Sequence, residues 1–122
     1  MTDRERAIES IERTMEASVA LRKHLLESER SGRKMISALK RGVPIPESVA
    51  ASGSNAAELR RSTNDLLNDF ELARHEMRAA FILPSVDGGM SIGEIGRALG
   101  VSRQLASRLV REARETLATV AS

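Results

Sequence analysis

The chain has 122 residues, of which 41% are hydrophobic, 30% are charged and 2% are aromatic, and it contains no cysteine. This composition excludes disulfides and cysteine-based zinc sites. The lack of Trp and Tyr argues against binding of single-stranded nucleic acid, whose bases stack on aromatic rings. Few strand-forming residues and abundant Ala, Leu, Glu and Arg predict an all-α protein.

The charge is unevenly distributed around a formal net charge of +2. Residues 1–41 carry ten basic and seven acidic side chains, residues 42–90 carry four and seven, and residues 91–122 carry five and three. We therefore expect the acidic middle to face basic ends of the same or a neighbouring chain. The first residues are charged and include no apolar run, so we expect no signal peptide, no membrane partner and a cytoplasmic location.

A first long helix is predicted from Thr2 or Asp3 towards Arg41. Ser31 and Gly32 predict a kink or a break, so this region forms either one long bent helix or a helix pair. The helix is expected to end at Gly42, shortly before Pro44. Its apolar residues are Ile8, Ile11, Met15, Val19, Leu25, Leu26, Met35, Ile36 and Leu39.

Residues 42–54 are predicted to form a connector with local mobility. Pro46 is a suitable residue to open one turn of helix from Glu47 to Ala51. Ser52 and Gly53 are expected to end that turn. Neither side of this connector is large enough for a good core of its own, so we do not expect a boundary between independent domains here.

A second long helix is predicted from Asn55 to about Leu83. Asn55 can cap it with Glu58 as the capping-box partner, and Pro84 is expected to stop it. Its apolar stripe alternates steps of four and three, which is typical of a heptad seam. A monomer would pack this seam against the first helix, whereas a homodimer, the interpretation we prefer, would pack it across a twofold axis. The seam consists of Leu59, Thr63, Leu66, Phe70, Ala73, Met77 and Ala80.

After a glycine-containing turn over residues 85–90, two short helices are predicted around a tight turn. Ser91 and Glu94 form a capping box for a helix over Ile92–Leu99, with Ile95, Ala98 and Leu99 on one face. Gly100 can take the positive φ that the turn requires, and Val101 is expected to be buried. Ser102 can cap the next helix, from Arg103 to about Leu117, and the tail after Thr116 is expected to fray. Its inner stripe is Ala106, Leu109, Val110 and Ala113, and the three-helix core is completed by Phe81, Ile82, Leu83 and Val86.

Gly96 lies inside the first of these short helices, where glycine is disfavoured by about 1 kcal/mol. Close crossing by the second helix is the simplest reason for a minimal side chain at this position.

The stretch from residue 90 to residue 115 resembles bacterial helix-turn-helix DNA-binding proteins, such as recombinase C-terminal domains, region 4 of sigma factors and repressors. The resemblance departs from the family pattern at Leu105 and Ala106, where the large and small residues are exchanged. The matching residues are Ile95, Gly96, Leu99, Gly100, Val101, Ser102, Arg103, Gln104, Ala106, Ser107, Arg108 and Leu109.

In this family the second helix enters the major groove and its early outward side chains contact bases. By position, the resemblance implies base contacts from Arg103, Gln104, Ser107 and Arg108. It also implies a phosphate contact from Ser102, and a phosphate or outer-base contact from Arg111. Ser91 completes the predicted DNA-binding set. Arg suits paired guanine acceptors and Gln suits adenine, which agrees with this assignment independently.

No catalytic or metal-binding pattern is present. His75 and Glu76 begin like H-E-x-x-H, but Ala79 stands where the second histidine would be, and His75 is expected to pair with Glu71 or with groups near Asp69. The pair of glycines before Met90 lacks the rest of a phosphate-binding loop. We therefore expect no enzyme, no cofactor and no metal.

The sequence thus predicts a small dimeric transcription regulator, bacterial or from a phage, that binds double-stranded DNA sequence-specifically. Residues 1–54 would form a helical region and connector, residues 55–84 the dimerisation helix, and residues 85–122 the DNA-binding unit. One alternative is a nucleoid-associated architectural protein with low sequence preference. Another is a helical adaptor that binds a partner such as the transcription machinery. The basic residues of the first helix then indicate either a solvated face or contacts to flanking phosphates: Arg22, Lys23, Arg30, Arg33, Lys34, Lys40 and Arg41.

Overall fold

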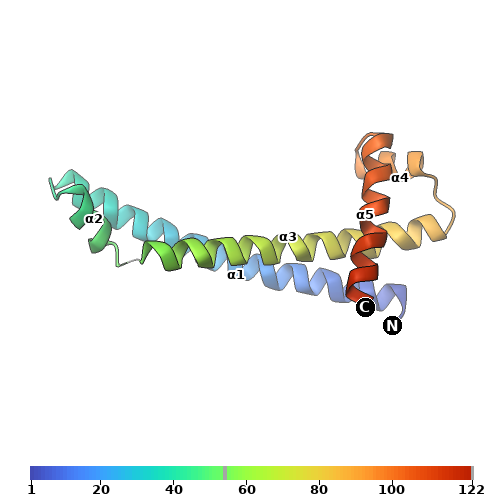
Figure 1. Ribbon diagram of the computed structural model, residues 1–122, viewed down its shortest axis with the longest axis horizontal. Coiled ribbons are helices and arrows are strands. Elements are labelled where there is room, and N and C mark those ends of the chain that lie inside the picture. Colours follow the sequence, from blue (N-terminus) through green and yellow to red (C-terminus); the bar gives the residue numbers. More distant parts are fainter. Residues whose placement is uncertain (54, 122) are drawn as a thin grey trace. The chain divides into compact units, whose positions relative to one another are not determined.

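The computed structural model describes every residue except Ser54 and Ser122, and every side chain except those two and Ala56, Val120 and Ala121. Ser54, the last residue of the predicted connector, and Ser122, the last of the tail, lie outside this description. The described residues form helices without strands, so the predicted all-α class is confirmed. The helices are α1 (Asp3–Lys40), α2 (Ile45–Ala51), α3 (Ala56–Asp87), α4 (Ile92–Leu99) and α5 (Arg103–Ala121) (Figure 1).

The chain divides into two compact units, each of which combines part of α1 with part of α3. The terminal unit contains residues 1–15 and 71–122, and the middle unit contains residues 16–70. The units therefore cut across the long helices, whereas the three predicted regions follow one another along the chain. Among the described residues, no helix has the length and apolar character needed to cross a membrane.

In the middle unit, α1 continues through Ser31 and Gly32, so the single-helix alternative is the one adopted. The helix ends at Lys40, two residues before the predicted stop at Gly42, which has a φ of +84°. The Val43 N–H donates to the Ala38 carbonyl at 3.1 Å, a bond that closes the last turn. The next helix, α2, includes Ile45 and Pro46 as well as the predicted turn.

The predicted seam of α3 is covered within the chain, because all its residues are buried or half-buried. A hydrogen bond of 2.7 Å joins His24 Nε2 to Thr63 Oγ1 in the middle unit. In the terminal unit the Thr14 hydroxyl lies 3.2 Å from the Ala73 carbonyl oxygen. The monomer therefore satisfies this seam by packing α3 against α1.

The side of α1 that packs against α3 is not the side that carries its large apolar residues. In the terminal unit the inward positions are Ala7, Ser10 and Thr14, which are small, whereas Ile8 and Met15 are 50% and 62% exposed. The hydroxyls of Ser10 and Thr14 donate to carbonyl oxygens of the preceding turn, at 2.8 Å each. These bonds satisfy both groups locally, so small polar residues can face a neighbouring helix without an unpaired hydroxyl.

Pro84 does not stop α3, which continues to Asp87. A proline φ is compatible with a helix. The cost is the hydrogen bond that the missing N–H would make to the carbonyl of Ala80, together with the steric conflict between the proline ring and that carbonyl. The chain turns away from the helix at Gly89, two residues after Asp87, where the φ is +104°, and the Met90 N–H donates to the Ser85 carbonyl at 3.0 Å. The predicted turn over residues 85–90 is therefore shortened by three residues.

The core of the terminal unit joins the end of α3 to α4 and α5, and the predicted stripe of α5 is buried as expected. The buried cluster consists of Ala79, Ile82, Ile95, Ala106, Leu109, Val110 and Ala113. Leu83, Val86 and the half-buried Val101 pack against it. α5 crosses α3 at this cluster (Figure 1).

Three details of this core differ from the prediction. Phe81 is 50% exposed and does not join the cluster, and on α4 both Ala98 and Leu99 are exposed. The inward positions of α4 are Ile92, Ile95 and Gly96, because these residues lie one turn apart on the side that faces α5. The helix α5 also extends to Ala121 rather than fraying after Thr116, and its Leu117 packs against the core.

Candidate nucleic-acid interface

The start of α4 is held by the predicted capping box. The Glu94 N–H donates to Ser91 Oγ at 3.1 Å, and the Ser91 N–H donates to Glu94 Oε1 at 3.3 Å. Both bonds satisfy N–H groups that a helix start leaves without partners. Ser91 is exposed, so the residue is accessible from solvent while it caps the helix.

The turn between α4 and α5 depends on two glycines. Gly100 has a φ of +71°, in the left-handed region that favours glycine. Gly96 is buried, and a Cβ there would lie 3.1 Å from the Val101 carbonyl oxygen and 3.4 Å from Ala106 Cβ. Ala106 is itself fully buried, so two small residues meet where the helices cross. This contact explains the exchanged sizes at residues 105 and 106: Leu105 is half-buried at the edge of the core instead.

The start of α5 is capped by Ser102. Its Oγ accepts the Leu105 N–H at 3.1 Å, and its carbonyl accepts the Ala106 N–H at 2.9 Å. Because the cap and the Gly96 contact both act on the first turn, the orientation of that turn is defined from two sides.

The side chains that the sequence predicts to contact DNA lie on one outward face of α5. Gln104, Ser107 and Arg111 follow one another at steps of three and four, on the side opposite the buried stripe. Arg103 and Arg108 flank them, and all five are exposed. Ser102 at the cap of α5 and Ser91 at the cap of α4 are exposed as well. The seven predicted residues are thus all accessible within the terminal unit.

Two further arginines of the terminal unit are exposed. Arg114 is exposed one turn beyond Arg111, and Arg97 is exposed on α4. Sequence reasoning did not include them in the site, although the spacing of Arg114 from Arg111 gave a signal for it. Arg97 gave none, because it lies outside the segment that the resemblance assigns to DNA contact.

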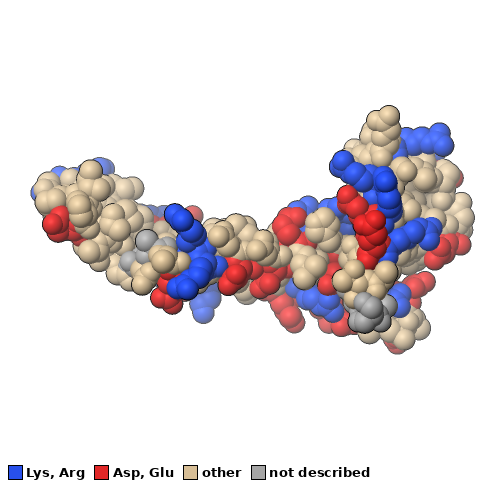
Figure 2. Space-filling view, viewed as in Figure 1, with Lys and Arg blue, Asp and Glu red and all other residues tan. Residues whose placement is uncertain are grey.

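Most of these arginines have no protein partner. Among the described residues, Arg97, Arg103, Arg111 and Arg114 have no ion pair, and Arg108 has one, with 3.7 Å between its Nε and Glu112 Oε1. The Arg108 side chain is 63% exposed, so this pair contributes roughly 0–1 kcal/mol and can be exchanged for another anion. Figure 2 shows basic side chains gathered over α5 with acidic ones between them.

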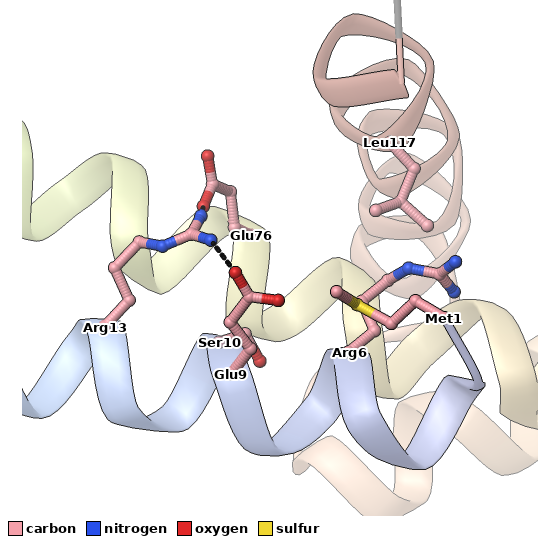
Figure 3. A pocket seen from close by; sticks show the side chains of 7 residues that line it. All are labelled: Met1, Arg6, Glu9, Ser10, Arg13, Glu76 and Leu117. Carbon is pink, nitrogen blue, oxygen red and sulfur yellow. Dashed lines mark hydrogen bonds and ion pairs between the residues drawn. The ribbon is translucent and has the colours of Figure 1, made fainter.

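A charged hollow in the terminal unit differs from the α5 face because its charges are paired with one another. This hollow has a volume of about 370 Å³. Side chains from the start of α1 and from the second half of α3 line it, and Leu117 of α5 lies opposite Met1 (Figure 3). Arg13 forms ion pairs with Glu9, at 3.0 Å, and with Glu76, and Arg6 pairs with Asp3 at 3.0 Å. Because its cations are already neutralised, this hollow lacks the open positive charge that distinguishes the α5 face. Sequence reasoning missed it because its walls come from three distant segments.

Other groups singled out in the sequence belong to α1 and α3. The seven basic residues of α1 are exposed and belong to the middle unit. His75 Nε2 lies 3.8 Å from Oε2 of Glu71, one of the partners expected for this histidine. Among the described residues, no cluster of three His, Asp or Glu side chains could hold a metal ion.

Comparison with known proteins finds no matching family model, no matching curated protein and no matching solved structure.

Proposed function

We propose that this protein binds double-stranded DNA by inserting the outward face of α5 into the major groove. The observation that carries this proposal is the set of exposed arginines on a helix whose start is capped and whose back is buried. A face of this kind offers both phosphate and base-edge contacts, and its rigid support limits the entropy lost on binding.

The residues divide by chemistry. Arg103, Gln104 and Arg108 are assigned to base edges, since guanidinium groups match the two guanine acceptors and a side-chain amide matches adenine. Ser107, between them, is short enough to let the backbone of α5 approach the bases, and its hydroxyl can contact either base type. Ser91 and Ser102, at the two helix caps, and Arg111, two turns into α5, are assigned to phosphates. Sequence-specific regulation of transcription is the role that such a set of base contacts would serve.

Selection from a random duplex library, followed by titration of the enriched site at fixed salt, tests this function. Arg103→Ala and Gln104→Ala are each expected to lower affinity by about 1–3 kcal/mol and to relax preference at one base position. Arg60→Ala is the matched control, because Arg60 is an exposed arginine of the middle unit. Absence of duplex binding at low salt, or an unchanged motif in both α5 variants, would contradict the proposal.

One observation favours a second candidate, an architectural protein with little sequence preference. The exposed segment from Arg22 to Arg41 carries seven basic and two acidic side chains, which suits contacts to phosphates alone. The ratio of specific to non-specific affinity separates the two candidates, since a specific reader typically binds its site at least about 10³-fold more tightly than other DNA.

A further inference from the structure

We propose that a second copy of this chain covers the exposed face of the first turns of α1, with the two α1 segments antiparallel. Such a dimer would present two α5 faces to one DNA site, and this role rests on the proposed function. The dimer itself depends on residues 1–15 and their neighbours in the terminal unit.

The face is apolar and open. Ile8, Ile11 and Met15 follow one another at steps of three and four, and they are 50%, 36% and 62% exposed. Phe81 and Pro84 of α3 adjoin Ile8 and Ile11 around a shallow hollow of about 400 Å³. Exposed apolar residues that are contiguous in this way mark surfaces that associate, whereas scattered ones need no explanation.

The charges of this segment identify what covers the face. Most are already engaged: Arg6 with Asp3, Arg13 with Glu9 and Glu76, and the Glu5 carboxylate with the Thr2 N–H at 2.9 Å. Among the described residues, only Arg4 and Glu12 of the charged side chains before Met15 make no ion pair or hydrogen bond.

These two open charges are opposite in sign and symmetric about Ile8. Arg4 lies one helical turn before Ile8, and Glu12 lies one turn after it. A twofold axis beside Ile8 therefore places Arg4 of each copy opposite Glu12 of the other and brings the two Ile8 side chains together. A parallel pair would instead set Arg4 against Arg4 and Glu12 against Glu12. The segment is thus complementary to itself in one orientation only, which is the property that an isologous interface requires.

Sedimentation equilibrium of the full chain without DNA, over a wide range of concentrations, tests the proposal. The wild type is expected to be a dimer, and Ile8→Asp is expected to weaken it by about tenfold or more, because a charge would be buried at the axis. Leu99→Asp, at an exposed leucine of α4, is the matched control and is expected to leave the dimer unchanged. Circular dichroism verifies that each variant is folded.

Charge exchange gives the decisive comparison. Arg4→Glu and Glu12→Arg are each expected to weaken the dimer, because each sets like charges together, and the double variant is expected to restore it. A monomer at all concentrations, or a dimer that Ile8→Asp leaves intact, would overturn the proposal, as would a double variant weaker than both single ones. A dimer without DNA binding would refute the proposed function alone, whereas DNA binding by a monomer would refute this inference alone.

Discussion

Gly96 and Ala106 meet where α4 crosses α5, with 3.4 Å between Ala106 Cβ and the position that a Cβ on Gly96 would occupy. The same Cβ would lie 3.1 Å from the Val101 carbonyl oxygen. Since that oxygen belongs to the backbone of the turn, a larger residue at position 96 must displace the start of α5. The orientation of the proposed DNA-contacting face therefore depends on a glycine that makes no contact with DNA itself.

Gly96→Ala is expected to destabilise the protein by about 1–3 kcal/mol, because the added methyl group overpacks the crossing. Gly93→Ala is the matched control in the same helix, where the nearest atom to a new Cβ is the flexible Arg97 Nη1 at 3.6 Å. That substitution is expected to raise stability by about 0.5–1 kcal/mol through helix propensity. Urea denaturation measures both, and equal effects would contradict the account of the crossing.

Removal of the caps is expected to reduce stability without changing the base preference of α5. Ser91→Ala should cost about 0.5–2 kcal/mol, because the Glu94 N–H loses its acceptor. Ser107→Ala provides the contrast: Ser107 is exposed in the middle of α5 and its hydroxyl makes no described hydrogen bond, so stability should change by less than about 0.5 kcal/mol. Thermal unfolding compares the two, and a larger loss for Ser107→Ala would count against the capping argument.

Arg111→Ala is expected to weaken DNA binding almost uniformly across sequences, because Arg111 is assigned to a phosphate. Loss of one phosphate contact should reduce the slope of log affinity against log salt by about 0.9. Arg103→Ala should instead change the preferred sequence. Titrations at several salt concentrations on matched and mismatched duplexes distinguish the two effects, and a change of preferred sequence in Arg111→Ala would show that its assignment is wrong.

Glu112→Gln is expected to strengthen DNA binding severalfold, because it releases Arg108 from its only ion pair among the described residues and removes a negative charge from α5. Stability should change by no more than about 1 kcal/mol, since the pair is exposed. Glu47→Gln, at an exposed glutamate of α2, is the control for a general change in net charge. Equal gains in the two variants would indicate a long-range charge effect instead.

Leu109→Ala is expected to lower the free energy of unfolding by about 2–5 kcal/mol, because it opens a cavity between α3 and α5. Leu109 is 9% exposed, whereas Leu99 is 45% exposed, so Leu99→Ala is the appropriate comparison and should cost far less. Chemical denaturation gives both values. Similar costs would mean that the core is not centred on the buried stripe of α5.

The parts of the fold that sequence reasoning predicted well are those encoded locally. The bounds of α4 and the start of α5 follow from Ser91, Gly100 and Ser102, each of which acts on its own turn of backbone. The inner face of α1 could not be predicted in this way, because apolar periodicity selects Ile8 and Ile11 whereas packing against α3 uses smaller residues. No local signal distinguishes a helix face that packs within its own chain from one that remains open.

The end of α3 illustrates the same limit. Pro84 is a strong stop signal in isolation, but Ile82 and Val86 on either side of it both contribute to the core of the terminal unit. The apolar contacts on both sides offset the lost hydrogen bond and the steric cost of the proline ring, so the helix continues. For the candidate site, accessibility of the seven predicted residues agrees with the expectation, while their DNA contacts remain a prediction.

The small inner face of α1 has a thermodynamic consequence. Ala7, Ser10 and Thr14 remove little apolar surface from water, so the attachment of this segment to α3 is weak for its length. If a neighbouring molecule supplies the missing burial, unfolding of this segment is linked to dissociation by mass action, and the melting temperature rises with the amount of protein in the cell or the cuvette. Dilution would then lower the stability of this segment, because it shifts the equilibrium towards the dissociated chain.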